Sequence, residues 1–236
     1  MTRKQYLNTL QRGVTLLELS VVLLILVALA GLAVPYVGGI GSTASCQTTD
    51  ATMHAVKEAI MGGAAGAGFY GDTLGRYPSP QSNPTSFSLT YLFEQGGWQS
   101  YNSKTGVGWR GPYLMNGGMS PGGLDTSFSS IYALANPTGK VHADITINTQ
   151  VFDGWHRPIV LQIPYDTDHN SLSYNYARLV SAGAGNGINP GDAVIDTKIA
   201  YSSATTPLPT ASDRGDDRVL YLKYPDPSVD GNTSCD

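Results

Sequence analysis

The chain has 236 residues, enough for one or two domains with a sizeable core, which excludes a mini-protein scaffold held together mainly by cross-links. Charged residues make up 14% of the chain, well below the roughly 25% of an average soluble domain, so the globular part is expected to be weakly charged and loop-rich. The net charge is −4 and no long Lys/Arg run occurs, so the sequence gives no support for a specific nucleic-acid binder, which must neutralise phosphates.

The first elements in chain order are a basic leader and an apolar helix. Residues 1–13 contain Arg3, Lys4 and Arg12 and no acid, and they precede the apolar residues 14–37. A helix of these 24 residues would be about 36 Å long, which exceeds the roughly 30 Å of a bilayer core. We therefore expect a single transmembrane span with the leader in the cytoplasm and the C-terminal bulk across the membrane.

A carboxylate interrupts the apolar segment at Glu18. A charged side chain inside the membrane costs roughly a few kcal/mol unless it has a partner. Cleavage after Gly13 would create an α-ammonium group on Val14, close enough to pair with Glu18 of the same or a neighbouring chain. An ordinary secretory signal cleaved near Ala28-Leu29-Ala30 and a plain membrane anchor are the alternatives, and both leave Glu18 unexplained.

The segment RGVTLLELSVVLLILVALAGLAVP resembles the N-terminus of type IV prepilins and type II secretion pseudopilins, with Gly13, Glu18 and Pro35 at matching positions. The resemblance implies that a prepilin peptidase cleaves after Gly13 and methylates the new N-terminus, Val14, where the family usually has Phe. It also implies homologous pilin or pseudopilin subunits, the inner membrane and an assembly platform as partners. The expected location is the bacterial inner membrane with the head in the periplasm, followed by incorporation into a filament.

The apolar helix is expected to continue into an amphipathic half. Glycines between residues 31 and 41, together with Pro35, predict a kink or weak point, because both residue types weaken a helix interior. Within residues 42–61, Met53, Val56 and Ile60 recur at helical spacing and predict a buried face. A glycine-rich run then ends the helix. The predicted organisation is a leader (1–13), a helix (14–64) and a globular head (65–236).

The head is expected to be a small antiparallel sheet packed on this helix, which makes the fold class α+β with a pilin-like arrangement. Strand-sized runs that are β-branched or aromatic in part predict strands at residues 129–135, 159–163, 178–181 and 218–223. Three segments, 108–114 (GWRGPYL), 152–162 (FDGWHRPIVLQ) and 179–188 (LVSAGAGNGI), are similar to segments of the major-pseudopilin branch. His156 stands where that branch usually has Gly.

The only cysteines, Cys46 and Cys235, both fall on the exported side of the predicted span. Paired cysteines in an oxidising compartment are usually bridged, so we expect a disulfide that ties the C-terminus back to the helix. The alternative is two thiols whose Cα atoms lie too far apart to bond.

The resemblance also raises the question of calcium, because the glycine-rich loop of the major pseudopilins holds that ion. Asp192 matches the first acid of the family's site, Val194 occupies the position of the second, and Asp216 and Asp217 are candidate substitutes. Carboxylates and carbonyl oxygens suit Ca²⁺. A solvated acidic loop without metal is the alternative.

No catalytic motif is present: the sequence lacks G-x-S-x-G, a P-loop and H-E-x-x-H, and its four histidines have no metal-ligand spacing. We therefore expect a structural filament subunit and not an enzyme, with a pseudopilin of type II secretion as the favoured machine. A minor type IV pilin for adhesion, twitching or DNA uptake is the runner-up. A binding domain on a prepilin anchor, supported by Tyr91, Trp98 and Tyr101 in a region without family resemblance, is the alternative of another class.

Overall fold

The computed structural model describes residues 15–64, 66–83, 87–115, 141–143, 151–164, 172–185, 214–223 and 235. The chain divides into two compact units, Met1–Gly41 and Ser42–Asp236. The elements, in chain order, are α1 (Leu16–Met61), α2 (Phe69–Asp72), η1 (Leu89–Leu92), β1 (Val141–Ala143), β2 (Val160–Pro164), η2 (Tyr174–Tyr176), β3 (Arg178–Ser181) and β4 (Arg218–Tyr221). This combination of a helix and a small antiparallel sheet confirms the α+β class.

Helix α1 has 46 residues and is continuous from Leu16 to Met61. The glycines and Pro35 predicted a weak point between residues 31 and 41, but the helical backbone passes through this segment without interruption. A proline removes one backbone donor from the hydrogen-bond ladder, and a long helix can lose a single bond without ending. Gly62, at a φ of 92°, follows the last helical residue and provides the left-handed conformation that terminates many helices.

Nowhere in the described part of the chain does a helix combine the length and the apolarity needed to cross a membrane. The span predicted at residues 14–37 extends beyond that part: Val14 lies outside the described residues, and so do the side chains of residues 32–37.

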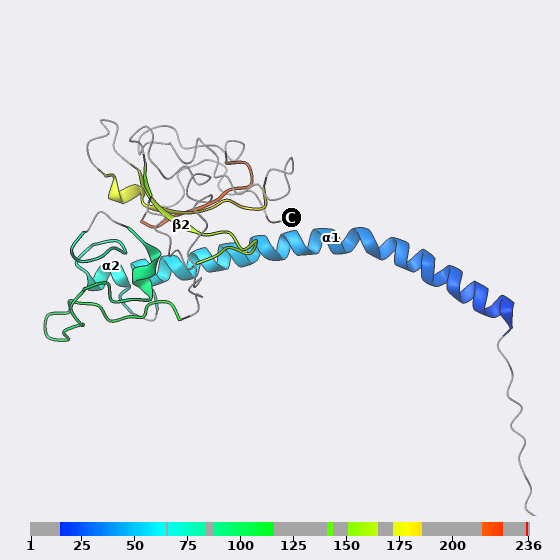
Figure 1. The fold of residues 1–236 in the computed structure, drawn as a ribbon, viewed down its shortest axis with the longest axis horizontal. Helices are drawn as coiled ribbons and strands as arrows, with labels where there is room; N and C mark the ends of the chain where they lie inside the picture. The colour runs from blue at the N-terminus through cyan, green and yellow to red at the C-terminus, as the bar shows by residue number, and fades with distance from the viewer. Residues whose placement is uncertain are drawn as a thin grey trace, which may run out of the picture. The chain divides into compact units, whose positions relative to one another are not determined.

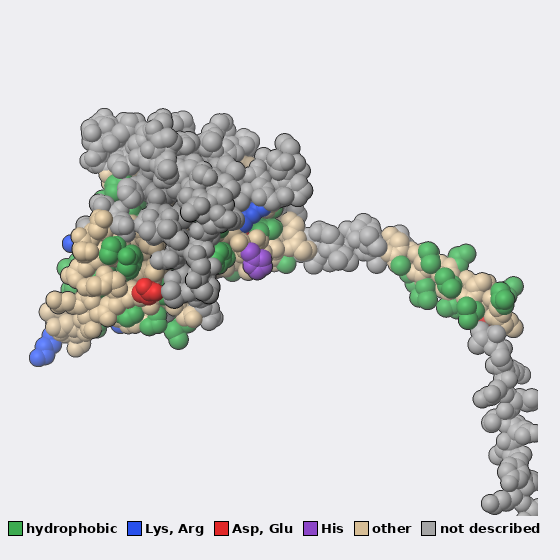
Figure 2. All heavy atoms as spheres, viewed as in Figure 1, with side chains coloured by type: hydrophobic (Ala, Val, Ile, Leu, Met, Phe, Trp, Pro, Cys, Tyr) green, Lys and Arg blue, Asp and Glu red, His purple; other side chains and the backbone are tan. Residues whose placement is uncertain are grey.

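The N-terminal half of α1 exposes its apolar side chains. Figure 2 shows hydrophobic side chains around this part of the helix. Leucines, isoleucines and valines between Leu16 and Leu29 have exposed fractions of 50 to 87%. The described part of this half therefore presents an apolar surface.

The second half of α1 provides one wall of the head's core. Met53, Val56 and Ile60 are at most 1% exposed and belong to the same hydrophobic cluster as Leu161 and Leu179 of the sheet. This agrees with the buried face that the helical spacing predicts. The strands lie against this half of the helix (Figure 1).

The sheet has the order β1-β2-β3-β4, and all neighbours are antiparallel. Across the three longer strands, Leu161, Leu179 and Leu220 occupy one row of the register, and all three pack in the helix-side cluster. The adjacent row, Gln162, Arg178 and Tyr221, projects from the opposite face, because successive side chains alternate. Its three side chains are also buried. Strand β3 has the predicted bounds, β2 and β4 differ from the predictions by one or two residues, and the strand predicted at 129–135 lies outside the described residues.

The region without family resemblance forms a second part of the core. Phe69 of α2 contacts Trp98 and Tyr113 edge-to-face, at ring-centroid distances of 5.9 and 5.7 Å. The indole N–H of Trp98 donates to the carbonyl of Ser79 at 2.7 Å, which satisfies its one donor. Trp98 therefore acts in the packing of this region.

Candidate functional site

The first turn of α1 contains a reciprocal hydrogen-bond pair around Glu18. The backbone N–H of Glu18 donates to Thr15 Oγ1 at 3.3 Å, and the backbone N–H of Thr15 donates to Glu18 Oε2 at 3.4 Å. This is a capping box, in which Thr and Glu three residues apart satisfy backbone donors that the helix leaves open. The T-x-x-E spacing carries this signal, which is additional to the expected role of Glu18 as a partner for an ammonium group.

The other residues predicted for processing and assembly are described only in part. Gly13 and Val14 lie outside the described residues, and Pro35 is described only as part of the helical backbone. The ion pair between Glu18 and the α-ammonium group of Val14 therefore stays a prediction.

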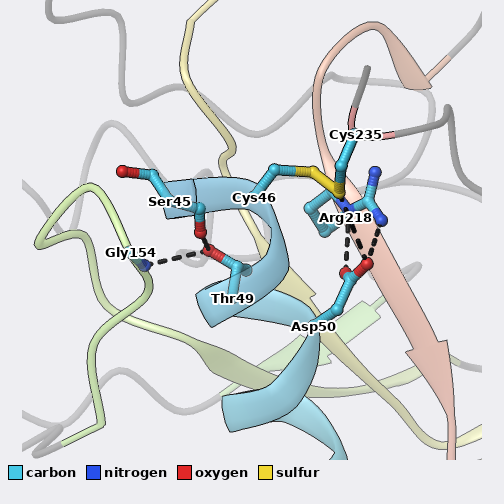
Figure 3. A network of polar contacts seen from close by, with 7 residues as sticks. All are labelled: Ser45, Cys46, Thr49, Asp50, Gly154, Arg218 and Cys235. Carbon is cyan, nitrogen blue, oxygen red and sulfur yellow. Dashed lines mark hydrogen bonds and ion pairs between the residues drawn. A yellow bond between two sulfur atoms is a disulfide. The ribbon is translucent and has the colours of Figure 1, made fainter. Parts of the chain in front are cut away.

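The C-terminus of the chain is attached to α1 at a second cluster (Figure 3). Cys46 and Cys235 are joined by a disulfide with a Cα–Cα distance of 5.6 Å and a sequence separation of 189 residues. One helical turn further along, Asp50 pairs with Arg218 of β4: Nε donates to Oδ1 at 2.9 Å, and Nη2 contacts Oδ2. Cys46 and Asp50 are four residues apart and share one face of the helix. One turn of α1 thus binds both the end of the chain and the start of β4.

This ion pair differs from an ordinary surface pair in its burial. The Arg218 side chain is 5% exposed and the Asp50 side chain 35%. The two hydrogen bonds form the bidentate fork that is favourable for arginine and a carboxylate. Loss of Asp50 would leave a buried guanidinium group with less compensation, a larger penalty than the loss of an exposed pair.

The turn at residues 153–157 packs against α1 on a neighbouring face of the same segment. The N–H of Gly154 donates to Thr49 Oγ1 at 2.9 Å, and the Thr49 hydroxyl donates to the Ser45 carbonyl at 2.8 Å (Figure 3). A Cβ atom at Gly154 would lie 2.1 Å from the Ser45 oxygen, so only glycine allows this approach. The D-x-W segment that resembles the major pseudopilins therefore contains the contact between the turn and the helix.

The buried carboxylate of Asp153 accepts three hydrogen bonds that hold this turn in place. Its Oδ1 accepts the backbone N–H groups of Trp155 and Arg157, both at 2.8 Å, and its Oδ2 accepts the Ser181 hydroxyl at 2.6 Å. Burial raises the pKa of Asp153, and the hydrogen bonds from Ser181 and the backbone, with the nearby Arg157 charge, oppose the increase. His156 in the same turn has a φ of 62°, which explains why a glycine suits this position.

The residues of the predicted calcium site do not form a metal site in the described part of the loop. The guanidinium group of Arg157 contacts the carbonyl oxygens of residues 182–184, and Asp216 Oδ2 accepts the N–H of Gly185. Asp217 is buried, at 2% exposed, while Asp192 lies outside the described residues. The carbonyl oxygens of this described part of the loop therefore already have a cationic partner, and the calcium site with Asp192 stays a prediction. The role of Arg157 could not be predicted, because no local sequence pattern places its side chain against a loop 25 residues away.

One group in the described part of the chain, Cys46, Asp50 and Cys235, has ligand atoms close enough together for a metal ion. Both sulfur atoms are bonded to each other in the disulfide, so they are not available as thiolate ligands. This group is therefore a structural cross-link beside an ion pair.

Comparison of the chain with protein-family models, with curated proteins and with solved structures gives no match.

Proposed function

We propose that this chain is the membrane-anchored precursor of a filament subunit of the type IV pilin-like class. The observation that supports the proposal best is the division of α1: its second half is buried in a head, while its first half exposes a nearly continuous set of leucine, isoleucine and valine side chains. Exposed apolar surface of this extent marks a site of interaction with a membrane or with other proteins. A helix bundle of many copies covers such surfaces after release from the membrane.

In this proposal Glu18 sets the register between copies. The carboxylate lies in the first turn of the exposed apolar half, where an unpaired charge would be unfavourable in a bundle core. Processing after Gly13 would place the ammonium group of Val14 one residue before the capping Thr15. The pair formed with Glu18, within one chain or between neighbours, would remove the cost of burying both charges.

Three variants separate the charge of Glu18 from its capping role. Glu18→Gln retains an oxygen that can accept the Thr15 N–H but loses the charge, Thr15→Ala loses the cap but retains the charge, and Glu18→Leu loses both. We expect Glu18→Leu and Glu18→Gln to abolish incorporation into sheared filaments and Thr15→Ala to reduce it modestly. Glu58→Gln, an exposed position on the head half of α1, is the matched control and should assemble normally.

The readout is the amount of subunit in the sheared filament fraction, measured beside the melting temperature of the full chain. An unchanged melting temperature with lost assembly supports the proposal, and normal incorporation of Glu18→Leu would contradict it. Mass spectrometry of the exported protein tests processing separately, since the proposal requires a methylated N-terminus at Val14.

Type II protein secretion is the machine we favour, on the strength of the three head segments that resemble the major pseudopilins. Deletion of the gene should then stop secretion of folded enzymes into the medium and leave twitching and DNA uptake intact. The reverse result would favour a minor pilin of a type IV pilus.

A second candidate, a binding domain on the same anchor, is favoured by one feature of the head. A cavity of about 570 Å³ lies between the loop after α2 and residues 98–108, lined by Arg76, Gln81, Trp98, Gln99 and Asn102. Amide side chains beside an aromatic ring are suited to bind sugar hydroxyl groups. Saturable binding of oligosaccharides to the full chain, lost in Gln99→Ala, would favour this candidate over the filament subunit.

A further inference from the structure

Three successive backbone carbonyl groups after β3 converge on one guanidinium group. Arg157 Nη1 donates to Ala182 O at 3.2 Å and also contacts Gly183 O, and Nη2 donates to Ala184 O at 3.1 Å. Arg157 is only 8% exposed. The loop therefore encloses a positive charge with a set of oxygen atoms, the arrangement in which proteins also hold hard metal ions.

Two further contacts, both with Asp216, fix the position of the loop at residues 182–185. Gly183 has a φ of 58°, and a Cβ atom there would lie 2.0 Å from the carbonyl oxygen of Asp216, so the backbone must approach that turn closely. The Asp216 carboxylate accepts the N–H of Gly185 and adds a negative charge beside the carbonyl groups. Asp153 accepts the backbone N–H of Arg157, and its carboxylate interacts electrostatically with the Arg157 charge. Carbonyl oxygens thus contact the guanidinium group, and a carboxylate bonds the same short loop at Gly185.

We propose that Arg157 is the resident cation of this loop, and that its guanidinium group takes the place a hard divalent cation would otherwise occupy. This assignment of the loop's cation does not rest on the proposed filament function. Calcium binds oxygen ligands at about 2.3–2.6 Å. A metal ion at that distance from the same carbonyl oxygens would lie next to the guanidinium charge and be repelled by it. The arginine side chain is always charged in proteins, so this repulsion persists.

The charge of Arg157 and its hydrogen bonds predict different results when the side chain is made neutral. If the charge of Arg157 excludes a metal ion, a neutral side chain at this position should open the oxygen-lined loop to calcium. If Arg157 only fills space and donates hydrogen bonds, neutralisation should destabilise the loop without creating any affinity for calcium.

The test compares the full chain with Arg157→Gln and Arg157→Lys in detergent solution. Equilibrium dialysis with radioactive calcium, up to the millimolar range typical of weak extracellular sites, measures the number of ions bound per chain. We expect Arg157→Gln to bind one calcium ion more than the unchanged chain, and its melting temperature to rise with calcium. Arg157→Lys retains the charge and should bind no additional ion.

The difference between variants is the deciding quantity, because any calcium bound elsewhere in the chain contributes equally to all three proteins. Equal binding by the unchanged chain and Arg157→Gln would overturn the proposal, and so would additional binding by Arg157→Lys. Should Arg157→Gln fail to fold without calcium, recovery of its folded signal on addition of calcium supports the proposal, and failure in both conditions contradicts it.

Discussion

The two halves of α1 belong to one continuous helix but find their packing partners in different ways. Leu24 in the first half is 70% exposed, whereas Ile60 in the second half is fully buried in the core of the head. The first half has one carboxylate, held by a local cap. The second half has Asp50 and Lys57, which reach β4 through Arg218 and the carbonyl of Tyr221.

This difference shows where each half obtains its stability. In proteins most helical stability comes from the packing of an apolar face and less from propensity. The chain itself provides that burial for the second half and not for the described side chains of the first. On the function proposed above, a membrane or other helices would cover the first half, and the following changes test this contrast.

The largest expected effect comes from the cross-link between the end of the chain and the second half of α1. Cys46→Ser removes a bridge that closes a loop of 189 residues. Such long loops give a large entropic restriction of the unfolded chain, so we expect a loss of about 5 kcal/mol in the free energy of unfolding. Chemical denaturation of the exported protein without reductant measures it.

The control is the unchanged chain in the presence of a reductant, which should approach the stability of Cys46→Ser. Thiol labelling of the folded, unreduced protein checks the bond directly. Two reactive cysteines there would show that the cross-link is absent from the exported protein.

The contrast between the halves is tested most directly by a matched pair of truncations. Ile60→Ala removes a fully buried side chain and should reduce the free energy of unfolding by about 3 kcal/mol, through lost burial and the cavity left behind. Leu24→Ala changes an exposed position and should shift the stability of the head by less than about 0.5 kcal/mol. Equal effects on the melting of the head would mean that the first half also packs within the chain.

Some of this organisation could be predicted from the sequence because its signals are local. The 3 and 4 spacing of Met53, Val56 and Ile60 specifies a helix face, and the strand-length run RLVS at residues 178–181 forms a strand with the predicted bounds. The helix continues through the predicted weak point before residue 42, because its ladder of hydrogen bonds is cooperative, and the kink itself stays a prediction.

The contacts that assemble the head could not be predicted in this way. Gly154 lies against Ser45, and Arg218 pairs with Asp50, across more than a hundred residues of sequence. These pairs depend on how the sheet docks on α1, and one sequence contains no signal for that docking. The capping box at Thr15 and Glu18 is different, since its spacing is visible in the sequence.

A smaller effect concerns the buried carboxyl group in the turn that packs on the second half of α1. Burial raises the pKa of Asp153 above 3.8, so its contribution to stability is complete below pH 3.8 and is lost as the pH rises through the raised value. The difference in free energy of unfolding between the unchanged chain and Asp153→Asn should therefore fall as the pH rises from 3.8. Urea denaturation at several pH values measures this difference, in which the other carboxyl groups cancel. A difference independent of pH would contradict the raised pKa.

The smallest expected effect is a gain in stability at the same turn. His156 has a φ of 62° and an exposed side chain, so it is held in a left-handed conformation that glycine adopts without strain. His156→Gly relieves that strain but also increases the freedom of the unfolded chain, and the two effects leave a net stabilisation of about 0.5 kcal/mol. His156→Ala is the matched control, because it removes the imidazole and retains the strained Cβ, and it should give no gain. Denaturation midpoints of the three proteins decide the matter: an equal gain for Ala and Gly would assign the effect to the imidazole, whereas a gain for Gly alone assigns it to the backbone of a turn that must fit against Ser45 of α1.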